Sequence, residues 1–483
     1  MKRTPFIAAV LALGGGGCVH AQQEAQPPVA ITHASVVDVE SGRTLRDQTV
    51  VVRGSRIEAV GPAARVAVPP GARTVDGRGK FVIPGLWDMH VHAAYPPADA
   101  LFMPVLVANG VTGVREMFSR LDWVASTRER IRTGELLGPR IVASGHIIDG
   151  NQPMLPGSVV VRDAAEARRA VDSLAAAGAD FIKVYSRLSP EAFAAIADEA
   201  KRRGLPFAGH VPGLVTVGAA SDAGMASVEH LTGLVDACSP LEPSEQNKVA
   251  EAVAAAGWDS ANAVAWAQSA SVLAHYDPAV CRALALRLAR NGTVMVPTLV
   301  TNRAGSFLDD TTQALDPRLR YLRAGISAAW NPRTNPRLAG VTAADWAARH
   351  AYYRHQLVIA RLLHENGVRF MAGTDLSTPY IYPGFSLHQE LEMLTQIGLT
   401  PLEALRAATL EPARFLKMAD SLGTVAPGKA ADLVVLDADP LADIRNVGRI
   451  HAVVLRGRLI DSAERERILR RAEAIAAGRD PEP

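Results

Sequence analysis

The sequence has 483 residues, of which 48% are hydrophobic and 21% are charged. These values are ordinary for a globular protein and exclude an intrinsically disordered chain. The 51 Lys and Arg residues nearly balance the 49 Asp and Glu residues, which argues against a protein that coats nucleic acid or an anionic membrane. At roughly 150 residues per domain, the length suffices for a large barrel with an accessory domain.

The first 21 residues are typical of a secretory signal sequence. Two basic residues precede the apolar run 6–13, and the small residue Ala21 ends a segment suited to cleavage. The apolar run is too short to cross a membrane, so we expect a signal peptide at 1–21 and a periplasmic or secreted mature chain. A second interpretation is a lipid anchor at Cys18, although Leu13 stands five residues before this cysteine, where lipoprotein signals usually place leucine three residues before.

Short Val- and Ile-rich runs separated by turn residues occur towards both ends of the sequence and are typical of β-strands. Three such runs lie within 31–60 and three within 431–460. We expect the segments 29–84 and 423–461 to form one small composite β-sandwich domain. The residues after it, 462–483, are expected to form a charged helix and a tail.

The central residues 85–422 alternate apolar, strand-like runs with alanine-rich helical patterns. This alternation implies a parallel sheet, and a count near eight units favours a distorted (β/α)8 TIM barrel over a doubly wound sheet. The fold class is therefore predicted to be α/β. The stretch 232–289 exceeds a normal strand-to-strand unit, so we expect an insertion there, with helices at 245–256 and 261–274.

Two cysteines, Cys238 and Cys281, lie inside this insertion. Export would place them in an oxidising compartment, where they can form one intramolecular disulfide. Two unrelated buried thiols are the alternative. Together with Trp258, Trp266 and Trp330, the insertion could form a lid with an aromatic pocket that favours hydrophobic acyl groups, although the tryptophans could also be packed in the core.

Six polar side chains end or interrupt five predicted barrel strands. The first two are spaced two residues apart, so both side chains lie on the same face of a strand. The carboxyl ends of barrel strands meet at one rim, where we expect the six to converge. The six residues are His90, His92, Lys183, His210, His230 and Asp375.

Imidazole and carboxylate groups suit divalent metal ions, zinc above manganese or cobalt. Lys183 stands in an apolar run, where a bare ammonium is costly to bury. Carbamylation by carbon dioxide would turn Lys183 into an anion that can bridge two metal ions. Each residue alone also fits a structural role, as a buried histidine or, for Asp375, as a helix cap. Together the six residues predict a site for two divalent metal ions.

The motifs around these residues resemble those of the amidohydrolase superfamily, in its imidazolonepropionase-like and proline-dipeptidase-like branch. The resemblance extends from about Ile31 to Asp461. It rests on the phrase Val82–Leu86 before the two histidines, on Gly110–Arg115, on Gly398–Leu405, and on Gly423–Leu433 with the following Asp439-Pro440-Leu441.

The resemblance implies a role for each candidate ligand. These roles are the more buried metal for His90 and His92, the carbamylated bridge for Lys183, the second metal for His210 and His230, and a further ligand and proton shuttle for Asp375. The implied reaction is hydrolysis of an amide bond through a metal-bridging hydroxide.

Residues that recognise the substrate are less evident. Tyr185 lies two residues beyond Lys183, on the same strand face and nearer the rim, where its hydroxyl could bind a substrate carboxylate or a developing oxyanion. Arg115 and Arg187 could anchor a C-terminal carboxylate, or could form ordinary salt bridges. The dipeptidase-like relatives often have a second histidine two residues after the position of His210, and its absence here puts a dipeptide substrate in doubt.

The sequence therefore predicts an exported binuclear zinc amidohydrolase that cleaves dipeptides or N-acyl amino acids. A cyclic-amide, lactone or carbamate hydrolase is the alternative among enzymes, because one such site can attack many carbonyls. A non-catalytic binding module on the same fold is the alternative from another class. We expect a small-molecule or peptide substrate, no nucleic-acid partner, no transmembrane helix and a homo-oligomer.

Overall fold

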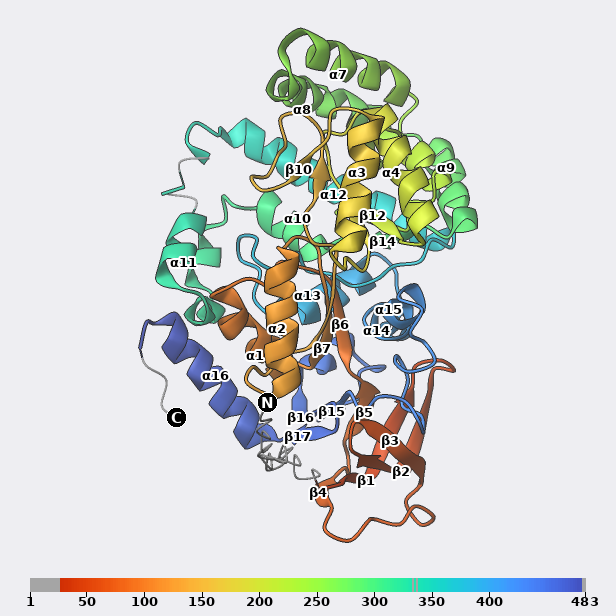
Figure 1. The fold of residues 1–483 in the computed structure, drawn as a ribbon, viewed down its shortest axis with the longest axis vertical. Coiled ribbons are helices and arrows are strands. Elements are labelled where there is room, and N and C mark those ends of the chain that lie inside the picture. Colours follow the sequence, from red (N-terminus) through yellow and green to blue (C-terminus); the bar gives the residue numbers. More distant parts are fainter. Residues whose placement is uncertain (1–26, 332–333, 336–337, 480–483) are drawn as a thin grey trace, which may run out of the picture.

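A computed structural model describes residues 27–331, 334–335 and 338–479. The expected signal sequence at 1–21, with Cys18, lies outside the described residues. Within the described ranges, no helix combines the length and apolar character needed to cross a membrane. The protein is a mixed α/β molecule in which parallel strands and their covering helices adjoin a separate sheet (Figure 1).

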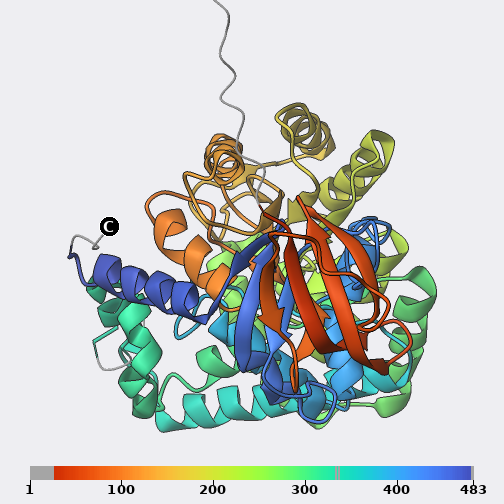
Figure 2. The same ribbon diagram turned by 90° about the horizontal axis from the view of Figure 1, so that it is seen from below.

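One eight-stranded sheet joins segments from the two ends of the sequence, seen from below in Figure 2. Its strands run in the order β17-β16-β15-β5-β1-β2-β3, and β4 pairs with β1. The end segments therefore pair as expected, and the strand pairings make one continuous sheet. The strands are β1 (Val29–Asp38), β2 (Arg43–Arg53), β3 (Arg56–Pro62), β4 (Arg73–Asp76), β5 (Phe81–Pro84), β15 (Leu433–Leu436), β16 (Ile450–Leu455) and β17 (Arg458–Ile460).

The remaining strands form two parallel sheets, in the orders β6-β7-β8 and β10-β9-β11-β12-β13-β14. Every residue of β6, β7, β11, β12, β13 and β14 is buried, as expected for parallel strands covered by helices. The strands are β6 (Leu86–Val91), β7 (Val111–Glu116), β8 (Arg140–Ala143), β9 (Ile148–Asp149), β10 (Val159–Val160), β11 (Ile182–Val184), β12 (Phe207–Gly209), β13 (Ser227–Glu229) and β14 (Val294–Val296).

Backbone hydrogen bonds connect the two parallel sheets at both ends. They join Asp180 N to Ala143 O, Met371 N to Met295 O, and Met89 N to Ala372 O, each at 2.9 Å. The segment 368–372 forms only the isolated bridge between Met295 and Phe370. This segment nevertheless lies between β14 and β6, so the parallel order continues through it.

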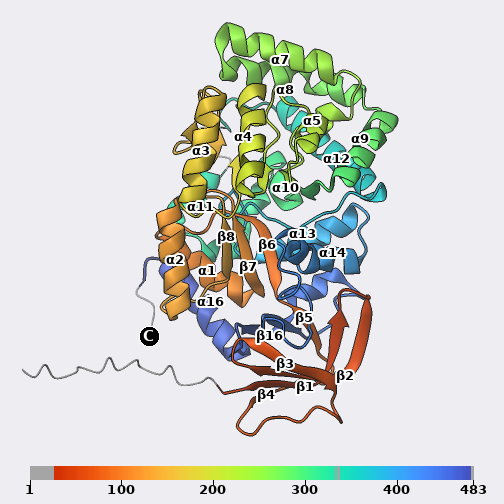
Figure 3. The ribbon, with the colours of Figure 1, turned by 45° about the vertical axis from the view of Figure 1, so that its right-hand side comes forward.

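Helices cover the outside of the parallel strands (Figures 1 and 3). The predicted insertion contains four of them, α6 to α9, and the charged C-terminal helix is α16. The helices are α1 (Ala98–Ala108), α2 (Leu121–Thr133), α3 (Ala164–Ala176), α4 (Pro190–Arg203), α5 (Val217–Asp222), α6 (Leu234–Ala237), α7 (Glu242–Ala256), α8 (Trp258–Ala274), α9 (Pro278–Asn291), α10 (Leu299–Ser306), α11 (Ala324–Trp330), α12 (Ala343–Glu365), α13 (Phe385–Gln396), α14 (Pro401–Ala407), α15 (Leu410–Phe415) and α16 (Ser462–Ala476), with 3₁₀ turns η1 (Thr311–Leu315), η2 (Pro317–Tyr321) and η4 (Ile444–Gly448).

Helix α4 shows how local chemistry sets the element boundaries. The Ser189 hydroxyl accepts the Ala192 N–H at 3.1 Å, and Pro190 occupies the first helical turn, where its missing N–H costs nothing. Gly204 ends the helix in the left-handed conformation, with φ of 69°. The residues at its two ends therefore account for the bounds of this helix.

The eight-stranded sheet is fastened to the parallel strands beside the predicted site. Strand β5 continues through Gly85 into β6, and a Cβ at Gly85 would lie only 2.1 Å from Thr112 Oγ1, so a side chain has no room there. The backbone oxygen of Asp432 accepts the Gly85 N–H at 2.8 Å, and its carboxylate pairs with Arg140 at 3.0 Å. These contacts fix the strand that carries His90.

Helices α7 and α8 form a hairpin that projects at the top of Figure 1. A disulfide joins Cys238, at the end of α6, to Cys281 in α9, and both cysteines are fully buried. Its sequence separation of 43 residues encloses the whole α7–α8 hairpin. The covalent bond thus holds the two ends of the excursion together.

Replacing both cysteines by serine should destabilise this part of the protein by about 2–4 kcal/mol, because the unfolded loop is then no longer constrained. The expected result is a lower Tm and faster proteolytic cleavage between residues 239 and 280 than in the wild type. Wild-type protein treated with reductant is the matched control and should behave like the double variant. Unchanged cleavage in both would contradict a stabilising role for the Cys238–Cys281 bond.

Candidate metal centre

The six candidate ligands line a single cavity of about 150 Å³. Each stands in a parallel strand, or shortly after a strand or the segment 368–372, as the convergence of strand ends predicts. They are His90 in β6, His92 directly after it, Lys183 in β11, His210 after β12, His230 after β13, and Asp375 after the segment 368–372. The other lining residues are Ile147, Leu155, Tyr185, Thr301 and Asn302.

The carboxylate of Asp375 lies beside both histidines of the first pair. Its Oδ1 atom is 3.1 Å from His92 Nε2 and 3.4 Å from His90 Nε2. Ligand atoms of His90, His230 and Asp375 lie within 4.8 Å of one another, close enough to share one ion. The ring of His210 lies 4.9 Å from that of His230, centroid to centroid. Imidazole and carboxylate donors therefore converge from several strands.

Three of the four imidazoles are held by a hydrogen bond at Nδ1. The bonds join His90 to Glu229 at 2.8 Å, His210 to Ser186 at 2.9 Å and His230 to Thr298 at 2.7 Å. A metal-binding histidine usually uses its second ring nitrogen in this way, because the bond fixes both the tautomer and the ring orientation. His90 Nε2 is buried and has no hydrogen-bond partner, so this atom remains available for a ligand.

The backbone turns sharply where two of the ligands leave the sheet. His230 and Asp375 adopt positive φ angles of 59° and 58°, which side-chain-bearing residues rarely do. The buried carboxylate of Asp88 holds the second turn by accepting the N–H and the hydroxyl of Thr374, at 3.0 and 2.6 Å. Strained backbone of this kind is typical of functional sites, where the surrounding contacts hold it in place.

A second buried carboxylate holds the turn beside His230. Glu390 accepts the N–H groups of Leu299 and Val300 at 3.0 and 2.8 Å, at the start of α10. These residues directly follow Thr298, whose hydroxyl contacts His230 and whose φ is 45°. Burial raises the pKa of Glu390 to about 8. Through its two hydrogen bonds, Glu390 holds the backbone that follows Thr298 next to the site.

The buried surroundings favour neutral imidazoles. Burial lowers the pKa of His90 and His210 well below the usual value and also lowers that of His230. Burial lowers the pKa of Lys183 to about 8, against the opposing effect of nearby carboxylates. For Asp375, burial acts to raise the pKa, but neighbouring groups, His230 foremost, hold it below the usual value. Neutral histidines and an ionised carboxylate are the forms that bind metal ions.

Tyr185 lines the cavity beside the ligands. Its ring stacks on His210 with a centroid separation of 4.0 Å, and Lys183 Nζ lies 5.7 Å from the ring centre. Burial raises the pKa of Tyr185, so its hydroxyl stays protonated and can donate a hydrogen bond. The expected position of Tyr185 on the Lys183 face of the strand agrees with this arrangement.

Neither arginine considered as a substrate anchor lines the cavity. Arg115 is fully buried and pairs with Glu229 at 2.8 Å, because its side chain points between the strands rather than to the rim. Arg187 pairs with Asp259 of α8 at 3.1 Å and donates to the Gln152 carbonyl at 2.5 Å. The structure therefore shows both arginines in ion pairs, which is the alternative to a substrate anchor that the sequence left open.

The hydrogen-bond partners of the histidines were not singled out from the sequence. Glu229 had one recognisable signal, since it is a carboxylate in a buried apolar strand and directly precedes His230. The hydroxyls of Ser186 and Thr298 have no such signal, because serine and threonine are common at strand ends and helix starts. Only the folded chain shows which hydroxyl meets which ring.

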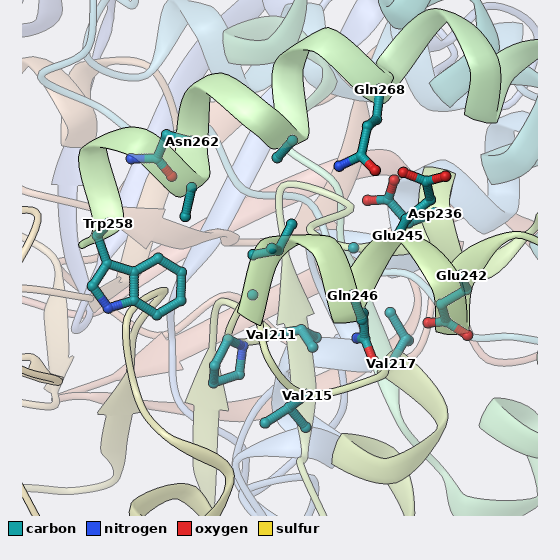
Figure 4. A pocket seen from close by; sticks show the side chains of 16 residues that line it. Val211, Val215, Val217, Asp236, Glu242, Glu245, Gln246, Trp258, Asn262 and Gln268 are labelled. Atoms are coloured by element: carbon teal, nitrogen blue, oxygen red, sulfur yellow. The ribbon is translucent and has the colours of Figure 1, made fainter. Parts of the chain in front are cut away.

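A second cavity of about 170 Å³ is lined on one side by the loop that follows His210 (Figure 4). Its lining includes Val211, Trp258 and the three carboxylates of Asp236, Glu242 and Glu245. Burial raises the pKa of Glu242 to about 7. Figure 4 shows the carboxylates at one end of this cavity and Trp258 at the other.

The tryptophans of the predicted aromatic lid do not meet in one pocket. Trp258 lines the second cavity, whereas the side chain of Trp266 is partly exposed near Tyr352. Trp330 lies beside Tyr380, at 5.9 Å between ring centroids. The helices α6 to α8 therefore contribute to a cavity with both apolar and carboxylate lining, and the apolar wall next to the candidate ligands comes from Ile147 and Leu155 instead.

The donor set in the first cavity fits divalent metal ions. The cavity is lined by neutral imidazoles and a carboxylate, and the buried Nε2 atom of His90 has no hydrogen-bond partner. Burying such polar groups without a ligand costs free energy. Lys183 lies in the same space, where a carbamate would add a further anionic oxygen ligand. The residues present are therefore suited to hold the metal ions that the sequence predicts.

Comparison with known proteins agrees with this chemistry. Residues 81–460 match the model of the Amidohydrolase family. Imidazolonepropionase from Pseudomonas putida (strain GB-1) is 26% identical over 432 residues, which cover 85% of this chain and 93% of that protein. Local matches to two further curated relatives are shorter, and the chain spans only 15% and 12% of their lengths.

Two solved structures extend the similarity to the whole fold. Bottromycin amidohydrolase superposes with a TM-score of 0.72 at 25% identity, covering 95% of this chain and 92% of that one. A Xaa-Pro dipeptidase with bound methionine in its active site superposes with a TM-score of 0.65 at 22% identity, covering 90% and 100%. The second likeness concerns the fold alone. Because the matched segment spans most of the sequence and contains every candidate ligand, the chain belongs to the amidohydrolase family.

Proposed function

We propose that the protein is a metal-dependent hydrolase that cleaves an amide bond, in a peptide or an N-acyl amino acid. The observation that carries this proposal is the convergence of six potential ligands on one cavity, where ligand atoms of His90, His230 and Asp375 lie within 4.8 Å of one another. Membership of the amidohydrolase family supports the reaction class. The apolar Ile147 and Leu155 beside the ligands supply a surface for a substrate side chain.

The proposal includes two divalent metal ions, Zn²⁺ being the best match to the mixed imidazole and carboxylate donors. His90 and His92 would hold one ion together with Asp375, and His210 and His230 the other. Lys183, carbamylated, would bridge them. The depressed pKa of Lys183, about 8, supports this modification, because only the neutral amine reacts with carbon dioxide.

When bound, the metal ions would supply an activated water molecule and a polarised substrate carbonyl. The carboxylate of Asp375, which lines the cavity, would accept the proton of the attacking water and pass it to the nitrogen of the leaving amine. The hydroxyl of Tyr185, which also lines the cavity, would donate a hydrogen bond to the oxygen that becomes negative. Proton transfer and oxyanion stabilisation are thus assigned to two side chains of the same cavity.

We further propose that the parallel strands close as the predicted distorted (β/α)8 barrel. The hydrogen bonds from β8 to Asp180 and from β14 through the segment 368–372 to β6 support a closed ring. The eight-stranded sheet, which joins segments from both ends of the sequence, would then form the accessory β-sandwich domain beside the barrel. Export, indicated by residues 1–21, belongs to the same proposal.

A second candidate substrate class is a neutral cyclic amide, lactone or carbamate. This alternative is favoured by the positions of Arg115 and Arg187, since neither described side chain lines the cavity where a substrate carboxylate would need a cation. The same ligands and the same proton shuttle would serve both classes, because both reactions begin with attack on a carbonyl carbon.

The substrate class is tested with zinc-loaded full-length protein and a library of dipeptides, N-acyl amino acids, lactones and carbamates. We expect release of an amino acid from the amide substrates, and a loss of at least about 10³-fold in kcat/KM for Lys183→Ala, which removes the proposed bridge. Lys201→Ala on the exposed end of α4 is the control and should keep full activity. Turnover of lactones or carbamates alone would favour the second class and exclude the amidase.

Removing the metal ions should abolish activity. Dialysis against a strong chelator is expected to lower kcat by about 10³-fold or more, because neither water activation nor carbonyl polarisation remains. Adding Zn²⁺ should restore the rate in proportion to the zinc content measured by elemental analysis. Undiminished turnover by metal-free protein would be incompatible with the proposed function.

The Tyr185→Phe variant should separate binding from catalysis. Phenylalanine preserves the stacking on His210 but removes the hydroxyl donor, so we expect kcat to fall about 10²–10³-fold with little change in KM. Steady-state kinetics on the best library substrate provide both constants. A raised KM with an unchanged kcat would instead assign the hydroxyl to substrate binding.

A further inference from the structure

Behind His90 lies a chain of buried charged groups that makes no contact with the cavity. The Nδ1 atom of His90 is 2.8 Å from Glu229 Oε2, and both side chains are fully buried. Because a carboxylate accepts hydrogen bonds, the proton resides on Nδ1 and the lone pair on Nε2 faces the candidate metal site. Glu229 therefore sets which nitrogen of His90 is free to bind a metal ion.

The second oxygen of Glu229 has its own partners. Oε1 accepts hydrogen bonds from Arg115 Nη2 at 2.8 Å and from the Ser227 hydroxyl at 2.6 Å. The guanidinium supplies the opposite charge that a fully buried carboxylate needs. With both oxygens occupied, the carboxylate plane is fixed with respect to the imidazole.

Arg115 is itself held on every side. Its Nε donates to the carbonyl of Met89 at 2.7 Å and its Nη1 to Ser227 Oγ at 2.9 Å. The guanidinium carbon lies 5.5 Å and 5.3 Å from the ring centres of Phe181 and Phe415. Arg115 thus joins β6, β7 and β13, and it restrains both the peptide that precedes His90 and the carboxylate that contacts the ring of His90.

A hydrogen bond to a carboxylate distinguishes His90 from the other candidate ligands, because His92 Nδ1 lies 3.8 Å from Glu116 Oε1, beyond hydrogen-bond distance. His210 and His230 bond to neutral hydroxyls, of Ser186 and Thr298, whereas His90 bonds to a carboxylate. A hydrogen bond to a charged acceptor is roughly twice as strong as a neutral one and makes the imidazole a better donor to a metal ion. His90, the candidate ligand with this stronger hydrogen bond, is also fully buried.

We propose that Glu229 and Arg115 are positioning residues that fix the tautomer and orientation of His90 and thereby set the affinity of the more buried metal site. This inference rests on the proposed metal-dependent function. It replaces the expected role of Arg115 as a substrate anchor. It also assigns a role to Glu229, which touches neither the cavity nor any substrate in it.

The test measures Zn²⁺ affinity of metal-free protein by competition with a chromophoric chelator. We expect Glu229→Gln and Arg115→Gln each to weaken the tighter site by about 10–100-fold, the range for supports of metal ligands. The double variant should lose less than the product of the two single losses, because both act through one contact. Glu199→Gln, which alters a buried carboxylate paired with the exposed Arg202 on α4, is the control and should stay within about threefold of wild type.

Two further measurements keep the test decisive. The visible spectrum of the Co²⁺-loaded protein should change in Glu229→Gln and not in Glu199→Gln, since it reports ligand geometry rather than stability. If Glu229→Gln fails to fold, judged by circular dichroism without metal, Arg115→Lys replaces it; this variant keeps the charge, loses the guanidinium fork, and should still weaken the tighter site.

The outcomes separate this inference from the proposed function. A wild-type protein that binds no Zn²⁺ would overturn the proposed function and this inference with it. Tight binding by the wild type, together with unchanged affinity and an unchanged Co²⁺ spectrum in the folded variants, would overturn the positioning role alone.

Discussion

The burial of several ionisable groups in one small cavity is the constraint on which the structure of this protein depends. Four imidazoles, a lysine and an aspartate share a space of about 150 Å³, and two ring nitrogens there have no hydrogen-bond partner. Burying such groups without a ligand is costly. Hydrogen bonds from buried carboxylates and hydroxyls offset part of this free-energy cost, and the proposed metal ions would offset the rest.

Two buried carboxylates illustrate how strand ends are held for this purpose. Asp88 ties β6 to the turn that carries Asp375, and Glu229 joins the ring of His90 to Arg115. Neither acid meets the cavity. Both carboxylates are buried on the side away from the cavity, and they hold the candidate ligands by hydrogen bonds. Buried hydrogen bonds of this kind are stronger than those at the surface. The site is therefore prepared by the fold before any ligand binds.

The cavity walls bear on the choice of substrate. Ile147 and Leu155 come from the loop region between β8 and β10, and Thr301 and Asn302 come from α10. Because these segments follow different strands, the shape of the pocket can vary without disturbing the ligands.

The sequence alone determined the features that arise locally. The bounds of α4 follow from Ser189 and Gly204, and Lys183 is recognisable as a candidate ligand because it breaks a pattern of adjacent apolar residues. The tertiary structure decided the rest. Arg115 and Glu229 are 114 residues apart, so only the packing of β7 beside β6 and across from β13 shows that they form a pair facing His90 instead of the substrate. Contacts between distant strands leave no local periodicity to read.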